Sequence, residues 1–260
     1  MARKRLSKIL QSLLASALMS TALVAQAAPA ARYDNQIETK VEKKLSGKRQ
    51  FRDVRSTVQD GIVTLTGSVD LYQRKLDAVK VTQKIPQVQG VRNFITIAGP
   101  SISDEELAQQ LAKKLAYVRS GYDSMFDYFS LGVKDGVVTL SGADRTGIGR
   151  DEALADVYTQ PGVKDVVNEV TVEPASLFDD GIRIRTARAI YRDPVLSKYA
   201  IDPARPIRII VANGHVTLYG AVDSSMDKTV AGMRANQIFG AFTVENKLSV
   251  RGNAADQPGM

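Results

Sequence analysis

The stretch DGIVTLTGSV at residues 60–69 decides the fold, because it recurs as DGVVTLSGAD at 135–144 and as NGHVTLYGAV at 213–222. Each stretch opens with Asp-Gly or Asn-Gly, the pair favoured where a two-residue β-hairpin turn needs positive φ at both central positions. The anchor glycines Gly61, Gly136 and Gly214 are 75 and 78 residues apart. This period is too long for a solenoid repeat and predicts a small domain copied three times.

Working outward from the hairpin, each copy has the same order of elements. An amphipathic segment comes first, with apolar residues at Ile37, Val41 and Leu45 in copy 1, and a strand of alternating apolar residues follows it. Copy 3 opens less regularly, and Ile184 and Ile190 are among its expected apolar residues. After the hairpin come a second helical stretch and a last alternating strand, in which an Asn lies 32 residues beyond each anchor glycine.

The order helix, strand, strand, helix, strand predicts an α+β fold of three tandem small αββαβ domains. Each domain is expected to have a three-stranded sheet with two helices on one face, because that arrangement buries the apolar stripes of both layers. The glycines that recur in and after the hairpin are expected to be structural: Gly61, Gly67, Gly136, Gly142, Gly214 and Gly220. The domains are predicted at 33–98, 102–174 and 178–251, followed by a tail at 252–260.

Residues 1–27 are predicted to be a secretory signal peptide. A basic head precedes an apolar run from about Ile9 to Val24, and Ala25-Gln26-Ala27 has the pattern of a cleavage site. A single membrane anchor is the alternative, although the run contains polar residues and is marginal in length for a span. Without this leader the chain has 31 basic and 28 acidic residues, so its formal charge falls from +7 to +3. An exported chain with so small an excess of positive charge is a poor candidate for nucleic-acid binding.

The composition also narrows the chemistry. The chain has no cysteine and one histidine, His215, which excludes sites built from histidine clusters or Cys-His pairs. We therefore expect no metal and no cofactor.

At the level of the repeat, the chain resembles the BON domain family. The resemblance rests on the alternating strand, the hairpin DGIVTLTG or DGVVTLSG, the glycine after the returning strand and the closing strand with its Asn. The third hairpin, NGHVTLYG, departs from the pattern at Asn213, His215 and Tyr219. The resemblance implies a periplasmic or envelope-associated, non-enzymatic protein of the osmotically inducible type. It also implies contact with phospholipid or hydrophobic surfaces, and no catalytic residues.

Two groups of residues are candidates for binding. The first is basic and lies on the opening helices of copies 1 and 3: Lys40, Lys43, Lys44, Lys48, Arg49, Arg183, Arg185 and Arg188. Such residues would attract anionic headgroups, or would simply form a solvated helix face. The second is the aromatic insert of copy 2, with Tyr122, Met125, Phe126 and Tyr128. Exposed, these side chains would suit an interfacial anchor; packed against a neighbouring copy, they would belong to a core.

The sequence thus predicts a periplasmic protein that responds to envelope or osmotic stress and contacts phospholipid through its repeated domains. The alternative is a periplasmic chaperone, a holdase for unfolded envelope proteins. Lipid binding to a weakly basic surface should weaken with salt, whereas capture of apolar client segments should not. The expected partners are an anionic membrane surface or envelope proteins, with no transmembrane segment in the mature chain.

Overall fold

The computed structural model describes residues 33–118, 125–173, 175–201 and 206–252. The predicted signal peptide and the tail from 253 onward lie outside the described residues. The chain divides into two compact units. One contains nearly all of copy 1, as residues up to Val69 and Arg74–Thr96, and the other contains Asp70–Gln73 and everything from Ile97 onward, which includes copies 2 and 3.

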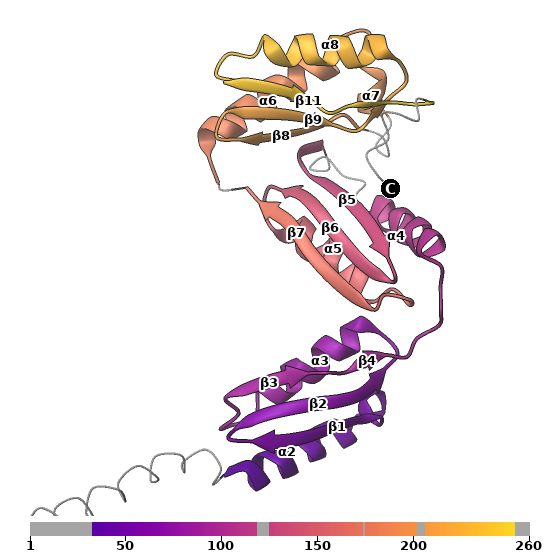
Figure 1. Cartoon of the computed structure of the whole chain (residues 1–260). Coiled ribbons are helices and arrows are strands. Elements are labelled where there is room, and N and C mark those ends of the chain that lie inside the picture. The colour runs from indigo at the N-terminus through magenta and orange to yellow at the C-terminus, as the bar shows by residue number, and fades with distance from the viewer. Residues whose placement is uncertain (1–32, 119–124, 174, 202–205, 253–260) are drawn as a thin grey trace, which may run out of the picture. The chain divides into compact units, whose positions relative to one another are not determined.

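Copy 1 has the predicted order of elements (Figure 1). They are α2 (Asp34–Ser46), the short 3₁₀ helix η2 (Arg49–Phe51), β1 (Val54–Gln59), β2 (Ile62–Val69), α3 (Tyr72–Gln83), β3 (Gly90–Asn93) and β4 (Thr96–Ile97). β1 pairs antiparallel with β2, whereas β3 pairs parallel with β2, so the returning strand of the hairpin is central. β4 continues the last strand and also pairs with β2.

Copies 2 and 3 repeat this topology. Copy 2 has α4 (Asp104–Val118), β5 (Tyr128–Lys134), β6 (Val137–Asp144), α5 (Ile148–Tyr158) and β7 (Asp165–Val172). Copy 3 has α6 (Leu177–Tyr191), α7 (Lys198–Ile201), β8 (Arg208–Ala212), β9 (His215–Tyr219), β10 (Ala221–Val222), α8 (Ser225–Asn236), β11 (Thr243–Asn246) and β12 (Ser249–Val250). The predicted α+β fold is confirmed, and short α7, between α6 and β8, is an addition that the repeat pattern does not contain.

The hairpin turns confirm the role predicted for the recurring glycines. Asp60 and Gly61 have φ of 52° and 75°, as the favoured hairpin turn requires, and the other two turns have nearly the same values. The second recurring glycine, which in copies 1 and 2 lies within the returning strand, is required for a different reason. A Cβ on Gly67 would lie 2.0 Å from the carbonyl oxygen of Asp53, and one on Gly142 would meet Tyr128 at the same distance. Only glycine lets the two strands approach so closely there.

The recurring Asn makes the same local contact within the last strand of each copy. In copy 1 the side-chain oxygen of Asn93 accepts a hydrogen bond from the N–H of Ile95, and Asn168 and Asn246 make the same contact two residues further along. In copies 1 and 3 this contact lies where the last strand is divided, into β3 and β4 and into β11 and β12, whereas in copy 2 strand β7 continues through it. The Asn thus keeps a buried apolar residue, such as Ile95 or Leu248, facing the helices after the break.

The helix stripes are confirmed in copy 1 and corrected in copy 3. Ile37, Val41 and Leu45 of α2 are all buried, as predicted. In α6 the buried apolar residues are Ile182 and Ile190, whereas Ile184 is exposed, so its prediction as a core residue is wrong. The pattern is obscured because three polar side chains, Asp179, Arg183 and Thr186, are also buried in α6.

Candidate functional site

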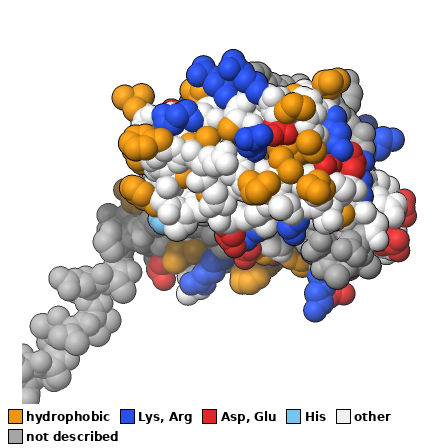
Figure 2. Space-filling model, turned by 90° about the horizontal axis from the view of Figure 1, so that it is seen from above, with side chains coloured by type: hydrophobic (Ala, Val, Ile, Leu, Met, Phe, Trp, Pro, Cys, Tyr) orange, Lys and Arg blue, Asp and Glu red, His pale blue; other side chains and the backbone are white. Residues whose placement is uncertain are grey.

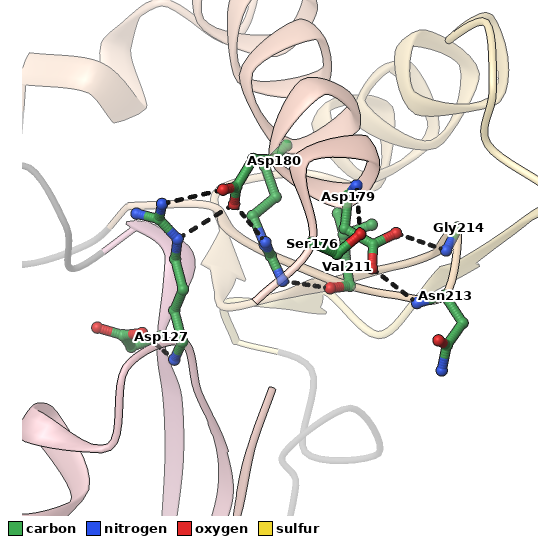
Figure 3. Close-up of polar contacts among 9 residues, drawn as sticks. Asp127, Ser176, Asp179, Asp180, Val211, Asn213 and Gly214 are labelled. Carbon is green, nitrogen blue, oxygen red and sulfur yellow. Dashed lines mark hydrogen bonds and ion pairs between the residues drawn. The ribbon is translucent and has the colours of Figure 1, made fainter. Parts of the chain in front are cut away.

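An aspartate at the start of the first helix holds the hairpin turn in every copy. Asp179 of α6 accepts hydrogen bonds from the N–H groups of Asn213 (3.0 Å) and Gly214 (2.7 Å), as Figure 3 shows. Asp34 and Asp104 make the same pair of contacts in copies 1 and 2. This tie fixes the start of the helix against the turn. In copy 3 this contact therefore holds the residues next to Asp179 close to the residues next to the turn.

Those neighbours form an exposed apolar cluster, here called the aromatic end of copy 3. Its members are Leu177, Phe178, Phe239 and Phe242. Leu177 is 93% exposed and Phe239 90% exposed, so both side chains project from the surface and touch almost nothing of their own chain. The rings of Phe178 and Phe242 lie 6.0 Å apart between centroids, and the ring of His215 meets Phe242 edge-on at 6.2 Å. The cluster joins the start of α6, the segment after α8 and the hairpin turn.

A basic flank of α6 adjoins the aromatic end. One side of the helix carries four residues at helical spacings of seven, three and four: Phe178, Arg185, Arg188 and Arg192. Arg185 and Arg188 are exposed, and the guanidinium of Arg185 donates a hydrogen bond to the carbonyl oxygen of Phe239 (3.1 Å). The acidic Asp180 points to the opposite side of the helix. Cations and apolar side chains thus share a single exposed edge.

The helix layer of copy 3 carries further exposed apolar side chains. Ile184 of α6, and Met226 and Met233 of α8, are also exposed. Figure 2 looks onto this layer and shows hydrophobic side chains beside Lys and Arg side chains. Among the described residues, nine of the fourteen exposed large hydrophobic side chains belong to copy 3. Single exposed apolar residues are ordinary, whereas a contiguous group such as the aromatic end is a candidate interaction surface.

Arg183 is also predicted to bind, with Arg185 and Arg188, but it does not belong to this surface. Its side chain is buried, and it donates hydrogen bonds to the carboxylate of Asp180 (2.6 Å) and to the carbonyl oxygen of Val211. The carboxylate of Asp180 also accepts hydrogen bonds from the guanidinium of Arg145, and this contact links copy 2 to copy 3 (Figure 3). Burial alone would raise the pKa of Asp180, but the hydrogen bonds from Arg145 and Arg183 outweigh it and hold that pKa below its usual value. Arg183 is therefore a structural cation.

The aromatic insert of copy 2 packs against copy 3. Tyr122 lies outside the described residues. Phe126 is buried in the core cluster of copy 3, and Met125 is partly buried against the same cluster. The ring of Tyr128 stacks on that of Tyr219 with centroids 3.9 Å apart. Of the two interpretations left open for the insert, an exposed anchor and a core, the structure supports the core for these three residues.

The basic residues predicted in copy 1 are exposed. Lys40, Lys43 and Lys44 lie on α2, and Lys48 and Arg49 follow its end. The ammonium of Lys48 lies 5.8 Å from the centroid of the Phe51 ring. The structure does not place these five residues beside the aromatic end, because they belong to the other compact unit.

The polar clusters of the described residues have structural partners. Lys198 forms ion pairs with Asp223 (3.2 Å) and Asp227 (2.8 Å), and the Tyr199 hydroxyl donates to Asp227 and accepts from the Asp223 N–H. These contacts tie α7 to the start of α8. Within the described ranges, no three His, Cys, Asp or Glu side chains gather to hold a metal ion, and no helix is long and apolar enough to cross a membrane.

Sequence reasoning missed the aromatic end. Its members come from two segments far apart in the sequence, and the packing of the start of α6 against the hairpin turn brings them together. A usable signal was present: Phe239 and Phe242 stand in the loop after a predicted helix, where apolar residues have no core to enter.

Solved structures give weak likenesses to this chain. CdsD, a structural protein of the type III secretion system of Chlamydia trachomatis, is 16% identical over 83% of this chain and 92% of that one, with a TM-score of 0.23. The periplasmic domain of the type III secretion inner-membrane protein PrgH from S. typhimurium is 10% identical over 78% of this chain and 96% of that one, with a TM-score of 0.18. Scores this low establish neither a common architecture nor a common function.

Family comparison is more informative. No curated protein matches the sequence. The BON domain model matches three regions, 33–99, 103–174 and 193–252, which together cover most of the chain. BON domains are generally non-catalytic and indicate a periplasmic or envelope-associated protein. With three matched regions and three copies of one αββαβ topology, the chain belongs to the BON domain family and carries three of its domains in tandem.

Proposed function

We propose that this chain is a periplasmic binding protein of the envelope or osmotic stress type that contacts phospholipid surfaces, mainly through copy 3. The observation that carries the proposal is the aromatic end, where four large apolar side chains are exposed beside Arg185 and Arg188. Aromatic and aliphatic side chains next to basic ones suit the boundary between lipid headgroups and acyl chains. The mechanism is reversible: shallow apolar insertion combined with headgroup contacts.

The shape of the aromatic end favours lipid over the alternative, a holdase for unfolded envelope proteins. Leu177 and Phe239 protrude rather than line a groove, since each is at least nine-tenths exposed. A protruding side chain gains burial by entering a fluid medium, which adapts to its shape. An extended client segment would be held better by a concave apolar groove, which these two side chains do not provide.

Flotation with vesicles tests the proposal. The chain from residue 28 onward is mixed with vesicles of phosphatidylglycerol and phosphatidylcholine, or of phosphatidylcholine alone, at low and high salt. The double variant Leu177→Ser with Phe239→Ser should bind both kinds of vesicle about tenfold more weakly or worse, because two side chains lose their apolar burial. Both are so exposed that the fold should be unaffected, which circular dichroism checks.

The matched control removes two exposed apolar side chains from the other copies. Phe94 and Ile148 are each 64% exposed, and Phe94→Ser with Ile148→Ser should bind like the unaltered chain. Equal losses in the two double variants would refute a site on copy 3. The holdase would be favoured over lipid binding if the unaltered chain does not float with vesicles but does suppress the aggregation of an unfolded outer-membrane protein.

A further inference from the structure

The three copies differ in charge in a way that their common fold does not require. Residues 33–98 contain 12 basic and 7 acidic side chains, a net charge of +5. Residues 102–174 contain 7 basic and 13 acidic side chains, a net charge of −6, and residues 178–251 contain 11 and 7, a net charge of +4. An anionic surface therefore attracts the two outer copies and repels the middle one.

In copy 1 the positive charge gathers on one flank of α2. Lys40, Lys43 and Lys44 are three and four residues apart, so they share one side of the helix next to its buried stripe. Glu38 and Glu42 share the opposite side, and so do not neutralise the lysines. The path of positive charge continues past the helix end into Lys48 and Arg49, which are also exposed.

Few contacts within copy 1 engage these five cations, apart from that of Lys48 with the ring of Phe51. Across the part of the chain that the structure describes, none of them forms an ion pair, and like charges three or four residues apart weaken a helix. In copy 2 the equivalent helix α4 begins with Asp104, Glu105 and Glu106, and its Lys114 is engaged by Asp156 (3.2 Å). The first helix of the domain is thus basic and without ion pairs for these cations in copy 1. In copy 2 the first helix begins with acidic residues, and Lys114 forms an ion pair.

We propose that the chain contacts an anionic phospholipid bilayer at two separate points: an electrostatic one on α2 of copy 1 and an apolar one at the aromatic end of copy 3. Copy 2, which is acidic, belongs to neither contact. This inference rests on the proposed function and adds a second contact of different chemistry. Because the two contacts belong to one chain, the binding of either raises the effective concentration of the other, and neither needs to be strong alone.

Charge reversal tests the contact on copy 1. The variant Lys40→Glu, Lys43→Glu and Lys44→Glu should bind vesicles that contain phosphatidylglycerol roughly a hundredfold more weakly, since each lysine near an anionic surface contributes about a fivefold gain in affinity. Its weak binding to pure phosphatidylcholine vesicles should not change. The matched control is Lys80→Glu, Lys84→Glu and Arg92→Glu, which makes the same charge change in copy 1 at positions outside α2.

The outcomes separate this inference from the proposed function. A large loss in the α2 variant and a small one in its control supports the contact on copy 1, and equal losses in both overturn it. If the α2 variant binds like the unaltered chain while the Leu177 and Phe239 variant does not, the two-point inference is wrong and the proposed function stands. If only the α2 variant loses binding, the aromatic end is not a lipid site. Combining both sets of substitutions should reduce flotation to background.

Discussion

Replacing Asp179 by Ala tests whether the tie between α6 and the hairpin turn stabilises copy 3. The Asp179 side chain is buried and accepts hydrogen bonds from the N–H groups of Asn213 and Gly214 at 3.0 and 2.7 Å. Hydrogen bonds to a charged group contribute about 1.5–3 kcal/mol each. The Asn213 contact is only part-buried, so water replaces some of it. We therefore expect the free energy of unfolding of copy 3 to fall by about 3 kcal/mol.

Hydrogen exchange measured by mass spectrometry resolves this loss copy by copy. A loss of about 3 kcal/mol corresponds to roughly 150-fold faster exchange of the slowest amides in β8 and β9. The strands β1 and β2 of copy 1 should exchange as before. Asp34→Ala is the matched control, because it removes the same tie from copy 1, where the contacts are more exposed, and should accelerate only copy 1, by less. Less than about fivefold acceleration in β8 and β9, or equal acceleration in all copies, would refute the reasoning.

Two further predictions concern packing. Gly67→Ala should lower the stability of copy 1 by more than about 2 kcal/mol, because its Cβ would lie 2.0 Å from the carbonyl oxygen of Asp53 on a backbone with positive φ. The control is Gly90→Ala, whose Cβ meets nothing within 4 Å. Equal shifts of the two variants in thermal unfolding would contradict the explanation. Phe126→Ala should destabilise copy 3 by about 3 kcal/mol although Phe126 belongs to copy 2, since it leaves a cavity in that core. Unchanged exchange of β8 would show that Phe126 is not part of the copy 3 core.

Local patterns predicted most of the fold. The Asp-Gly pair specifies the turn by its own conformational preference, and Val63 and Leu65 alternate because one face of the sheet is buried. These features depend on residues close in sequence, so each copy repeats them visibly. The same reasoning correctly assigned the recurring glycines, whose roles follow from backbone geometry alone.

Contacts between distant residues were not predictable in this way. The aspartate that holds each turn lies 27, 32 or 35 residues before its glycine, because insertions of different length separate them, and so the three aspartates do not align at one offset. Arg183 occupies a position on α6 where a basic residue would ordinarily be solvated. Its burial depends on Asp180 and on a carbonyl oxygen of β8, neither of which periodicity reveals.

The position of Phe126 has a consequence for how the chain is made. Synthesis proceeds from the N-terminus, so copy 2 is complete before β8, β9 and α8 of copy 3 have emerged. Until then we expect Phe126 and Met125 to have no core to enter and to remain an exposed, aggregation-prone apolar segment. A chain that ends prematurely between copies 2 and 3 would keep this segment exposed permanently.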